Sequence, residues 1–334
     1  RLLINLSAED KPFLLNLMPI LKAHGLSGAA TAKAFDITSL QETAQKAGVD
    51  AILLSQPATL KALLGETATL EKYRGSRLNY KIPVLVINPL AHIHSINYGK
   101  WLLNNDLRKL KRIKQPIQQF SFELIDTEEK REGALQFLSE CLVISHDIET
   151  NSPLIKDNTL ILPADITCIA FCSLHKTGIV KTFVVPFIDF QGIHYASPHE
   201  MEQAVLFMRT VLALPATKTA WNGSYDTQYE IRYQAWPENW TMDGMILAWS
   251  EYSELPRAIE FHASLHCYDY IFWKDQSEQA KKAKDNMSYW GYCGQDAWYS
   301  LRILLSLLSD LKEHQIHNYK RTFRQVYPDL YCAF

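Results

Sequence analysis

The sequence predicts an α/β protein of two units, because short apolar runs alternate with amphipathic segments along its 334 residues. Runs such as DAILLS (50–55) and IPVLVINP (82–89) are rich in Val, Ile and Leu, as buried strands are. The segment SLQETAQKAG (39–48) has helical periodicity and ends in Gly, a usual helix stop. Strands and helices alternating at this spacing favour a parallel sheet in a three-layer arrangement.

The first unit is predicted to span residues 1–114 as a small three-layer α/β domain. TAKAFDI (31–37) is expected to be a strand and PATLKALLG (57–65) a helix. The basic segment LRKLKRIKQP (107–116), which ends in Pro, marks the predicted domain boundary. Two interpretations of this segment stay open, a solvated helix face and a patch that contacts phosphate groups.

The second unit is predicted to span residues 118–318, with a mixed central sheet flanked by helices. ITCIAFCSLH (166–175) and IVKTFVVPF (179–187) are β-rich runs joined by the turn KTG, which indicates a hairpin. The other expected strands are 119–126, 141–150 and 217–221, and the expected helices include 127–140 with Thr127 as N-cap, 199–214 and 224–236.

Composition excludes some classes of protein. The net charge of −2 argues against a wholly basic nucleic-acid binder, although a basic groove remains compatible with it. The six cysteines are scattered without a CxxC pair, which favours free thiols in a reducing cytoplasm. No apolar run approaches the roughly 20 residues of a membrane span, so no membrane partner is expected. Because the chain starts at Arg1 and stops at Phe334, we expect a piece of a longer protein.

The stretch VISHDIETN (143–151) places two carboxylates near the end of an apolar strand. Side chains two residues apart on a strand share a face, so Asp147 and Glu149 are expected to stand side by side. Their charges repel, and each raises the pKa of the other. A divalent cation between them turns this repulsion into coordination, and Mg²⁺ and Mn²⁺ prefer carboxylate ligands. His146 is expected to point to the opposite face in a structural role.

Further acids occur at positions that suit the same site. Asp226 lies in WNGSYDTQ, directly after a predicted strand and in the first turn of a helix, where the helix dipole favours its charge. Tyr292 and Asp296 are four residues apart in a long predicted helix and therefore share a face. Asp243 in TMDGM is interpreted as a helix cap rather than as a metal ligand.

The order DxE, then NxxxD, then YxxxD resembles the DEDD superfamily of 3′–5′ exonucleases, in the subgroup with Tyr in the third motif. Residues 118–318 resemble more narrowly the proofreading domain of family A DNA polymerases, especially those of bacteriophages. The resemblance implies a ribonuclease H-like fold and two divalent cations, Mg²⁺ or Mn²⁺. Their implied ligands are Asp147, Glu149, Asp226 and Asp296, and Tyr292 is implied to orient the attacking water.

The resemblance also implies a substrate, the single-stranded or frayed 3′ end of DNA, and nucleoside 5′-monophosphates as products. It places Thr150 and Asn151 near the terminal nucleotide. Asn222 either hydrogen-bonds the DNA or holds its own turn. Tyr225 and Tyr289, like Trp290, either stack on bases or pack in the protein. Two other functions stay open, a free-standing exonuclease acting on RNA or single-stranded DNA and a non-catalytic DNA-binding or assembly module.

Two flanking segments extend the resemblance. Residues 1–114 resemble the uracil-DNA-glycosylase-like domain of some phage polymerases, through their strand–helix order and IPVLVINPLAHIHS (82–95). The segment has Asn88-Pro89 where the family has His-Pro, and no Gly-rich acidic motif precedes it, so we expect a scaffold or DNA-docking role without glycosylase activity. Residues 319–334 resemble a connector into a polymerase domain, which would act in DNA replication in the cytoplasm of a bacterium or phage-infected host.

Overall fold

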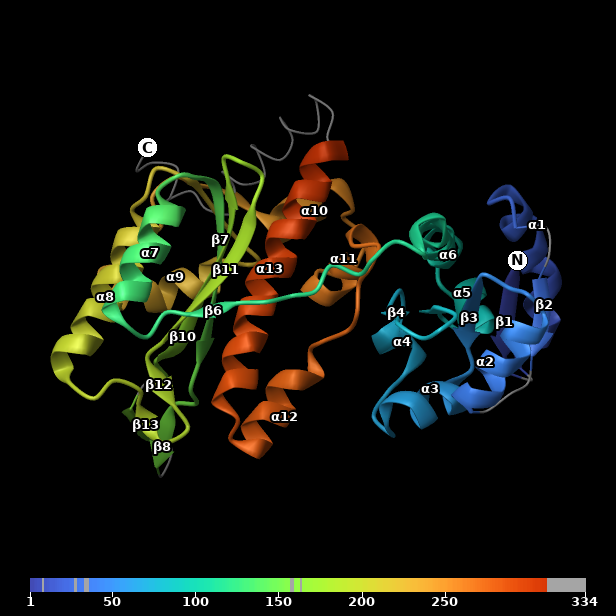
Figure 1. Cartoon of the computed structure of the whole chain (residues 1–334), viewed down its shortest axis with the longest axis horizontal. Coiled ribbons are helices and arrows are strands. Elements are labelled where there is room, and N and C mark those ends of the chain that lie inside the picture. The colour runs from blue at the N-terminus through green and yellow to red at the C-terminus, as the bar shows by residue number, and fades with distance from the viewer. Residues whose placement is uncertain (8, 27–28, 33–35, 157–158, 163, 311–334) are drawn as a thin grey trace. The chain divides into compact units, whose positions relative to one another are not determined.

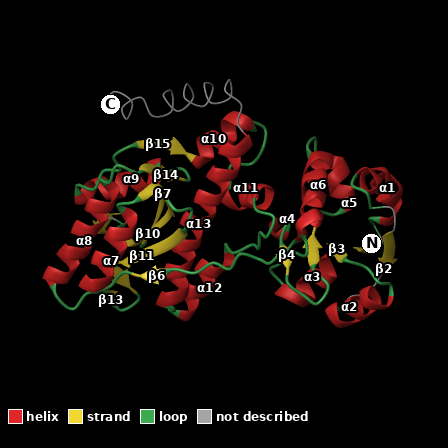
Figure 2. Cartoon of the chain, turned by 45° about the horizontal axis from the view of Figure 1, so that its top comes forward, coloured by secondary structure: helices red, strands yellow, loops and turns green. Residues whose placement is uncertain are grey.

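The computed structural model describes residues 1–7, 9–26, 29–32, 36–156, 159–162 and 164–310. The chain divides into two compact units, Arg1–Gln118 with Ser264–Phe272, and Gln119–Ala263 with Trp273–Phe334. Both units combine helices and strands, which confirms the predicted α/β class (Figures 1 and 2). The predicted connector, residues 319–334, lies outside the described residues.

The first unit is built on a five-stranded sheet in the order β2-β1-β3-β5-β4. Its pairs are parallel except for β4 with β5, so the predicted parallel sheet carries one short antiparallel edge strand. The strands are β1 (Leu2–Leu6), β2 (Ala29–Ala32), β3 (Ala51–Ser55), β4 (Arg77–Leu78) and β5 (Val84–Val86). The strand expected at 31–37 overlaps β2 only at residues 31–32. Residues 33–35 lie outside the described part, and the prediction is wrong at its end, where Asp36 caps α2 and Ile37 begins it.

Helices cover both faces of this sheet, as the three-layer prediction requires. Leu2 and Ile4 of β1 belong to one buried cluster and Leu3 to another, because alternate side chains of a strand point to opposite faces. The helices are α1 (Leu14–Ala23), α2 (Ile37–Lys46), α3 (Pro57–Leu64), α4 (Leu70–Tyr73), α5 (Leu90–Ser95) and α6 (Gly99–Arg108), with 3-10 turns at Lys11–Phe13 and Lys109–Arg112.

The second unit contains a six-stranded mixed sheet in the order β15-β14-β7-β10-β11-β6. β10 is antiparallel to β7 and β11, whereas β14 is parallel to β7 and to β15, which confirms the predicted mixed, ribonuclease H-like sheet and its hairpin. The strands of the sheet are β6 (Glu123–Leu124), β7 (Cys141–Thr150), β10 (Ile166–His175), β11 (Val180–Pro186), β14 (Thr217–Ala220) and β15 (Trp240–Asp243). Two small hairpins are formed by β8 (Leu154–Lys156) with β9 (Thr159–Leu162) and by β12 (Ile188–Asp189) with β13 (Gly192–Ile193).

The helices of this unit agree with the sequence except at their ends. Thr127 accepts a hydrogen bond from the Lys130 N–H, so the predicted N-cap is confirmed. The helix expected at 224–236 ends at Glu230 and continues as a 3-10 turn until Gln234, whose φ of 55° is left-handed. The helices are α7 (Glu128–Leu138), α8 (Pro198–Leu212), α9 (Ser224–Glu230), α10 (Gly244–Glu251), α11 (Ile259–His266), α12 (Asp275–Ala283) and α13 (Asn286–Asp310).

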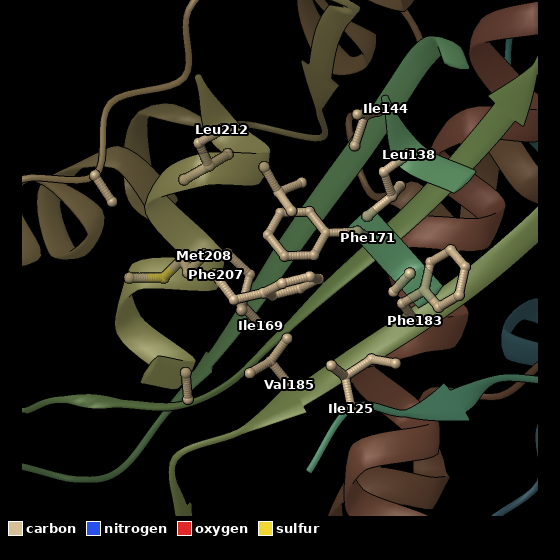
Figure 3. Close-up of a cluster of buried hydrophobic side chains, with 14 of the residues drawn as sticks. Ile125, Leu138, Ile144, Ile169, Phe171, Phe183, Val185, Phe207, Met208 and Leu212 are labelled. Atoms are coloured by element: carbon tan, nitrogen blue, oxygen red, sulfur yellow. The ribbon is translucent and has the colours of Figure 1, made fainter. Parts of the chain in front are cut away.

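The two faces of the mixed sheet have different roles. On one face the hydrophobic core packs against α7 and α8, where the rings of Phe171 and Phe207 meet edge to face at 6.5 Å (Figure 3). On the other face α13 lies against β7, β10 and β11. Long side chains of α13 and the outward residues of β7 therefore meet between helix and sheet. None of the described helices is both long and apolar enough to cross a membrane.

Candidate metal centre

Strand β7 directs two carboxylates away from the hydrophobic core. Ile144 and Ile148 are buried in the core on the α8 side of the sheet. Because β side chains alternate, Asp147 and Glu149 face the opposite side, where α13 packs. The Cys293 thiol of α13 donates to the Asp147 carbonyl oxygen at 3.4 Å, which ties the helix to this point of the strand.

Helix α13 brings the third acid to this pair. Asp296 is 5% exposed and lies one helical turn after Tyr292. Oxygen atoms of Asp147, Glu149 and Asp296 all lie within 4.8 Å of one another. Three of the four acids named from the sequence, which come from two distant segments, thus converge on one point.

Asp226 lies next to this trio but is not one of the three converging groups. It sits in the first turn of α9 and is 4% exposed. Its Oδ1 accepts a hydrogen bond of 3.0 Å from the Ile148 N–H, so it contacts the backbone between the two β7 acids. Its negative charge also contributes to raising the pKa of Asp147.

The electrostatics of the cluster favour a bound cation. Burial, and then the charges of neighbouring acids, raise the pKa of Asp147 well above its ordinary value. Burial and the charge of Asp296 raise the pKa of Glu149 to about 7. Burial raises the pKa of Asp226 to about 7, although backbone hydrogen bonds oppose this shift. All three acids are therefore harder to ionise than acids in water, which indicates a shortage of positive charge.

Lys274 is the residue that sequence reasoning missed. Its Nζ donates to Asp296 Oδ2 at 2.6 Å and to the Tyr292 hydroxyl at 2.9 Å. Burial lowers its pKa, but Asp296 and Tyr292 outweigh burial, and the pKa lies above its ordinary value. Trp273 adds a hydrogen bond of 2.5 Å from its Nε1 to Asp296 Oδ1. The sequence FWKDQ gives no local signal for this role, because a lysine just before a helix is ordinarily solvated.

Two tyrosines of α13 also contact the cluster. Tyr292 is 8% exposed, and burial raises the pKa of its phenol, so the hydroxyl stays protonated at neutral pH. The Tyr289 hydroxyl donates to Glu149 Oε2 at 3.0 Å, a contact that the sequence did not indicate. Tyr289 and Trp290 are both buried, which favours packing over base stacking for these two residues.

The candidate substrate residues lie around the end of β7. The hydroxyls of Thr150 and the exposed Tyr225 are 2.9 Å apart. Asn151 Oδ1 accepts the Asp165 N–H at 2.7 Å, so this side chain joins two loops. Asn222 has a φ of 63°, and its N–H donates to Asp243, which supports the turn-holding alternative for Asn222.

Two expectations about neighbouring residues are confirmed. His146 points away from the acids, and its Nε2 lies 3.4 Å from Glu230 Oε1 in the buried interior. Asp243 caps α10 by accepting the N–H groups of Met245 and Ile246.

The donor set fits a hard divalent cation. Asp147 Oδ2 is buried and has no hydrogen-bond partner among the residues that the structure describes. An unpartnered buried carboxylate oxygen is costly unless a cation or proton satisfies it. Three converging carboxylates are ligands that suit Mg²⁺ or Mn²⁺ and do not suit softer metals.

Comparisons with known proteins find similar solved structures only at a distance. No protein-family model and no curated protein matches the chain. The Trypanosoma brucei RNase D structure aligns at 15% identity and a TM-score of 0.46, over 63% of this chain and 72% of that one. The Aedes aegypti Nibbler EXO domain aligns at 12% identity and a TM-score of 0.42, over 60% of this chain and 96% of that one. Escherichia coli RNase D, an exoribonuclease involved in structured RNA processing, aligns at 15% identity and a TM-score of 0.33, over 57% and 45% of the two chains. Similarity at this level does not assign the chain to a family.

Proposed function

We propose that the second unit is a metal-dependent 3′–5′ exonuclease that removes nucleoside 5′-monophosphates from DNA 3′ ends. We further propose that it is the proofreading part of a family A DNA polymerase in the cytoplasm of a bacterium or phage-infected cell. The observation that carries the proposal is the convergence of Asp147, Glu149 and Asp296 within 4.8 Å. The motif order DxE, NxxxD, YxxxD supports the same reaction class. The first unit would be a scaffold or DNA-docking domain without glycosylase activity.

The four acids divide between two proposed cation positions. Asp147, Glu149 and Asp296 would hold one divalent ion, and Asp147 with Asp226 would hold the second. When bound, such ions stabilise charge on a phosphodiester and lower the pKa of water. The unpartnered Asp147 Oδ2 supports Asp147 as the shared ligand.

Tyr292 is proposed to position the attacking water rather than to remove its proton. The Lys274 ammonium has donors only, so the Tyr292 oxygen accepts from it and the phenol proton remains available to another acceptor. The raised pKa of Tyr292 keeps that proton in place at pH 7. Lys274 would also hold Asp296 in a fixed orientation through its second hydrogen bond.

Substrate contacts are proposed at the open end of β7. The exposed Tyr225 and its partner Thr150 offer one aromatic face and two hydroxyls to a terminal nucleotide. These groups carry no base-specific pattern, so discrimination would come from how readily a 3′ end frays into a single strand. Asn151 and Asn222 would act by shaping the loops beside that nucleotide.

Degradation of end-labelled oligonucleotides tests the proposal. Single-stranded DNA and RNA of one sequence are incubated with the full chain in Mg²⁺, in Mn²⁺ or in chelator. We expect stepwise shortening from the 3′ end of DNA with release of 5′-monophosphates, and none in chelator. The variant Asp147→Ala, Glu149→Ala should be inactive.

The matched control removes an acid of the same unit outside the cluster. Asp126 forms an ion pair with Lys130 at 2.6 Å, so Asp126→Ala should keep wild-type activity. Wild-type protein that degrades neither polymer, or a double variant that degrades DNA at the wild-type rate, would contradict the proposal. Degradation of RNA alone would overturn the DNA assignment and keep the reaction class.

A further inference from the structure

Asp243 receives four backbone hydrogen bonds from two different segments. It is the last residue of β15 and is 0% exposed. Its Oδ1 accepts the N–H groups of Met245 at 2.9 Å and Ile246 at 3.2 Å, which start α10. Its Oδ1 also accepts the Asn222 N–H at 3.3 Å, and its Oδ2 accepts the Gly223 N–H at 2.9 Å. One carboxylate thus joins a helix cap to the turn that follows β14.

The turn that Asp243 holds is conformationally demanding. Asn222 has a φ of 63°, a left-handed conformation that costs energy for a residue with a side chain. A Cβ on Gly223 would lie 2.6 Å from the Trp240 ring and 2.8 Å from Ala220, so only Gly fits there. Strained backbone of this kind persists only where its surroundings hold it.

Helix α9 starts from this turn. The N–H of Tyr225 donates to the Asn222 carbonyl at 3.0 Å, and the N–H of Thr227 donates to the Gly223 carbonyl at 3.0 Å. Asp226 lies between these two residues in the first turn. A change in the conformation of the turn would therefore move the Asp226 carboxylate.

Asp226 then contacts the backbone of β7 beside the acid cluster. Its Oδ1 accepts the N–H of Ile148, the residue between Asp147 and Glu149. The backbone pairing of β14 with β7 ends at Thr219 opposite Ser145, before the acids begin. The Asp226–Ile148 bond links the two segments beyond the end of that ladder.

We infer that Asp243 is a positioning residue of the metal centre, which fixes the turn that aims Asp226 at the backbone between Asp147 and Glu149. The inference rests on the proposed metal centre. It assigns a role to a buried acid outside the DxE, NxxxD and YxxxD motifs. Asp243 contacts neither substrate nor metal in this role and acts through the turn and Asp226.

Substitution by Asn separates the two functions of the carboxylate. A helix cap needs one side-chain oxygen, and Asn caps helices as well as Asp does. In Asp243→Asn the retained oxygen can keep the Met245 and Ile246 bonds. The amide NH₂ then replaces Oδ2 and faces the Gly223 N–H. Both groups are hydrogen-bond donors, so the bond to Gly223 is lost. A capping role alone predicts no effect, whereas the positioning role predicts a loosened turn.

The matched control is Asp36→Asn. Asp36 caps α2 in the first unit by accepting the Ser39 N–H at 2.8 Å. Both variants of the full chain are compared with wild type by Mn²⁺ titration calorimetry, amide exchange at Ile148, thermal unfolding and exonuclease rate. For Asp243→Asn we expect Mn²⁺ affinity and rate to fall about 10–100-fold, the usual cost of losing a support of a metal ligand. Exchange at Ile148 should accelerate, while Asp36→Asn should match wild type in affinity, rate and Ile148 exchange.

Two results would contradict the inference. If Asp243→Asn keeps the Ile148 exchange rate and the Mn²⁺ affinity of the wild type, Asp243 is only a helix cap and the inference is wrong. The double variant Asp243→Asn, Asn222→Gly should recover part of the lost Mn²⁺ affinity and slow the exchange at Ile148 again, because Gly adopts a positive φ without strain. If the single variant unfolds, the double variant should fold. No recovery would also contradict the inference. If wild type proves to have no nuclease activity, the calorimetric and exchange results still decide the role of Asp243.

Discussion

Each of the two units contains a cluster of buried charged residues, and the two clusters differ in whether opposite charges are paired. In the first unit Arg74 Nη1 lies 2.7 Å from Asp106 Oδ1, and both side chains are almost fully buried. Lys109, also buried, donates to the Gly75 carbonyl oxygen at 2.7 Å. Burial raises the pKa of Asp106 and lowers that of Lys109 to about 8, but the opposite charges in the cluster oppose both shifts.

The second cluster has acids in excess. Asp147, Glu149 and Asp296 converge with Asp226 beside them, and Lys274 is the cation that contacts Asp296 directly. Here the neighbours of Asp147 are mostly like charges, and they add to the effect of burial on its pKa instead of opposing it. A buried ion pair is costly to break because each partner would be left uncompensated, whereas an excess of buried acids favours the binding of a cation.

The largest expected effect comes from removing a central acid of the unbalanced cluster. Asp147→Asn should lower the exonuclease rate at least about a thousandfold, because a lost metal ligand removes several kcal/mol of transition-state stabilisation. Thermal unfolding in chelator should stay equal or move to higher temperature, since a like-charge repulsion is relieved. Unfolding scans and single-turnover rates measure the two effects. A variant that loses stability as well as activity would show that the acids serve the fold.

Breaking the Arg74–Asp106 pair of the first unit should have the opposite effect, a loss of stability. Arg74→Met should lower the free energy of unfolding by about 3–5 kcal/mol, because it leaves Asp106 buried without its partner. The double variant Arg74→Met, Asp106→Leu should restore most of that loss. Urea unfolding followed by fluorescence provides the measurement. A change below about 1 kcal/mol would place this pair with ordinary surface ion pairs.

The pH dependence of stability sharpens the comparison. The pKa values of Glu149 and Asp226 are raised to about 7 from 4.5 and 3.8. Between these values the folded state retains protons that the unfolded chain has released, so the free energy of unfolding falls as pH rises towards 7. Mg²⁺ should cancel this fall, most strongly above pH 7, because a cation favours the ionised acids.

Thermal midpoints between about pH 5 and 8, with chelator or Mg²⁺, test this linkage. Glu149→Gln in chelator provides the control, because it removes the titration of one of these acids and should make the fall shallower. If the Glu149→Gln profile is as steep as that of the wild type, the raised pKa of Glu149 is wrong.

The smallest expected effect separates two neighbouring lysines of α12. The Lys281 Nζ lies 5.1 Å from the centre of the Tyr289 ring, whose hydroxyl contacts Glu149. Lys282 instead pairs with Glu278 at 2.6 Å. We expect Lys281→Gln to raise KM a few-fold and to reduce the salt slope of DNA binding by about one, as for the loss of one phosphate contact. Lys282→Gln should change neither quantity, and equal effects of both variants would contradict a specific contact.

The sequence predicted the acid cluster because its signals are local. The DxE spacing on a strand, the acid after a strand end and the YxxxD spacing on a helix each fix a face or a terminus. Topology then brings these faces together. Hydrophobic periodicity predicted most strands of both sheets for the same reason. It did not predict β1 (Leu2–Leu6), β4 (Arg77–Leu78) or β15 (Trp240–Asp243).

The parts that the sequence did not predict depend on distant contacts. Lys274 acquires its role only because α13 places Asp296 and Tyr292 beside it. The strand expected at 119–126 shrinks to β6, Glu123–Leu124, because only these residues pair with β11. Residues 264–272 belong to the first compact unit although they lie between segments of the second. The hydrophobic periodicity within a segment does not indicate which distant segment it will contact.

The central claim is that the acids of β7 and α13 bind divalent metal together. Anomalous diffraction from crystals soaked in Mn²⁺ tests it most directly, since the signal locates the metal without assuming any activity. We predict a peak coordinated by Asp147, Glu149 and Asp296 that disappears in Asp147→Asn crystals. A map with no peak between these side chains, or with a peak unaffected by the substitution, would contradict the account.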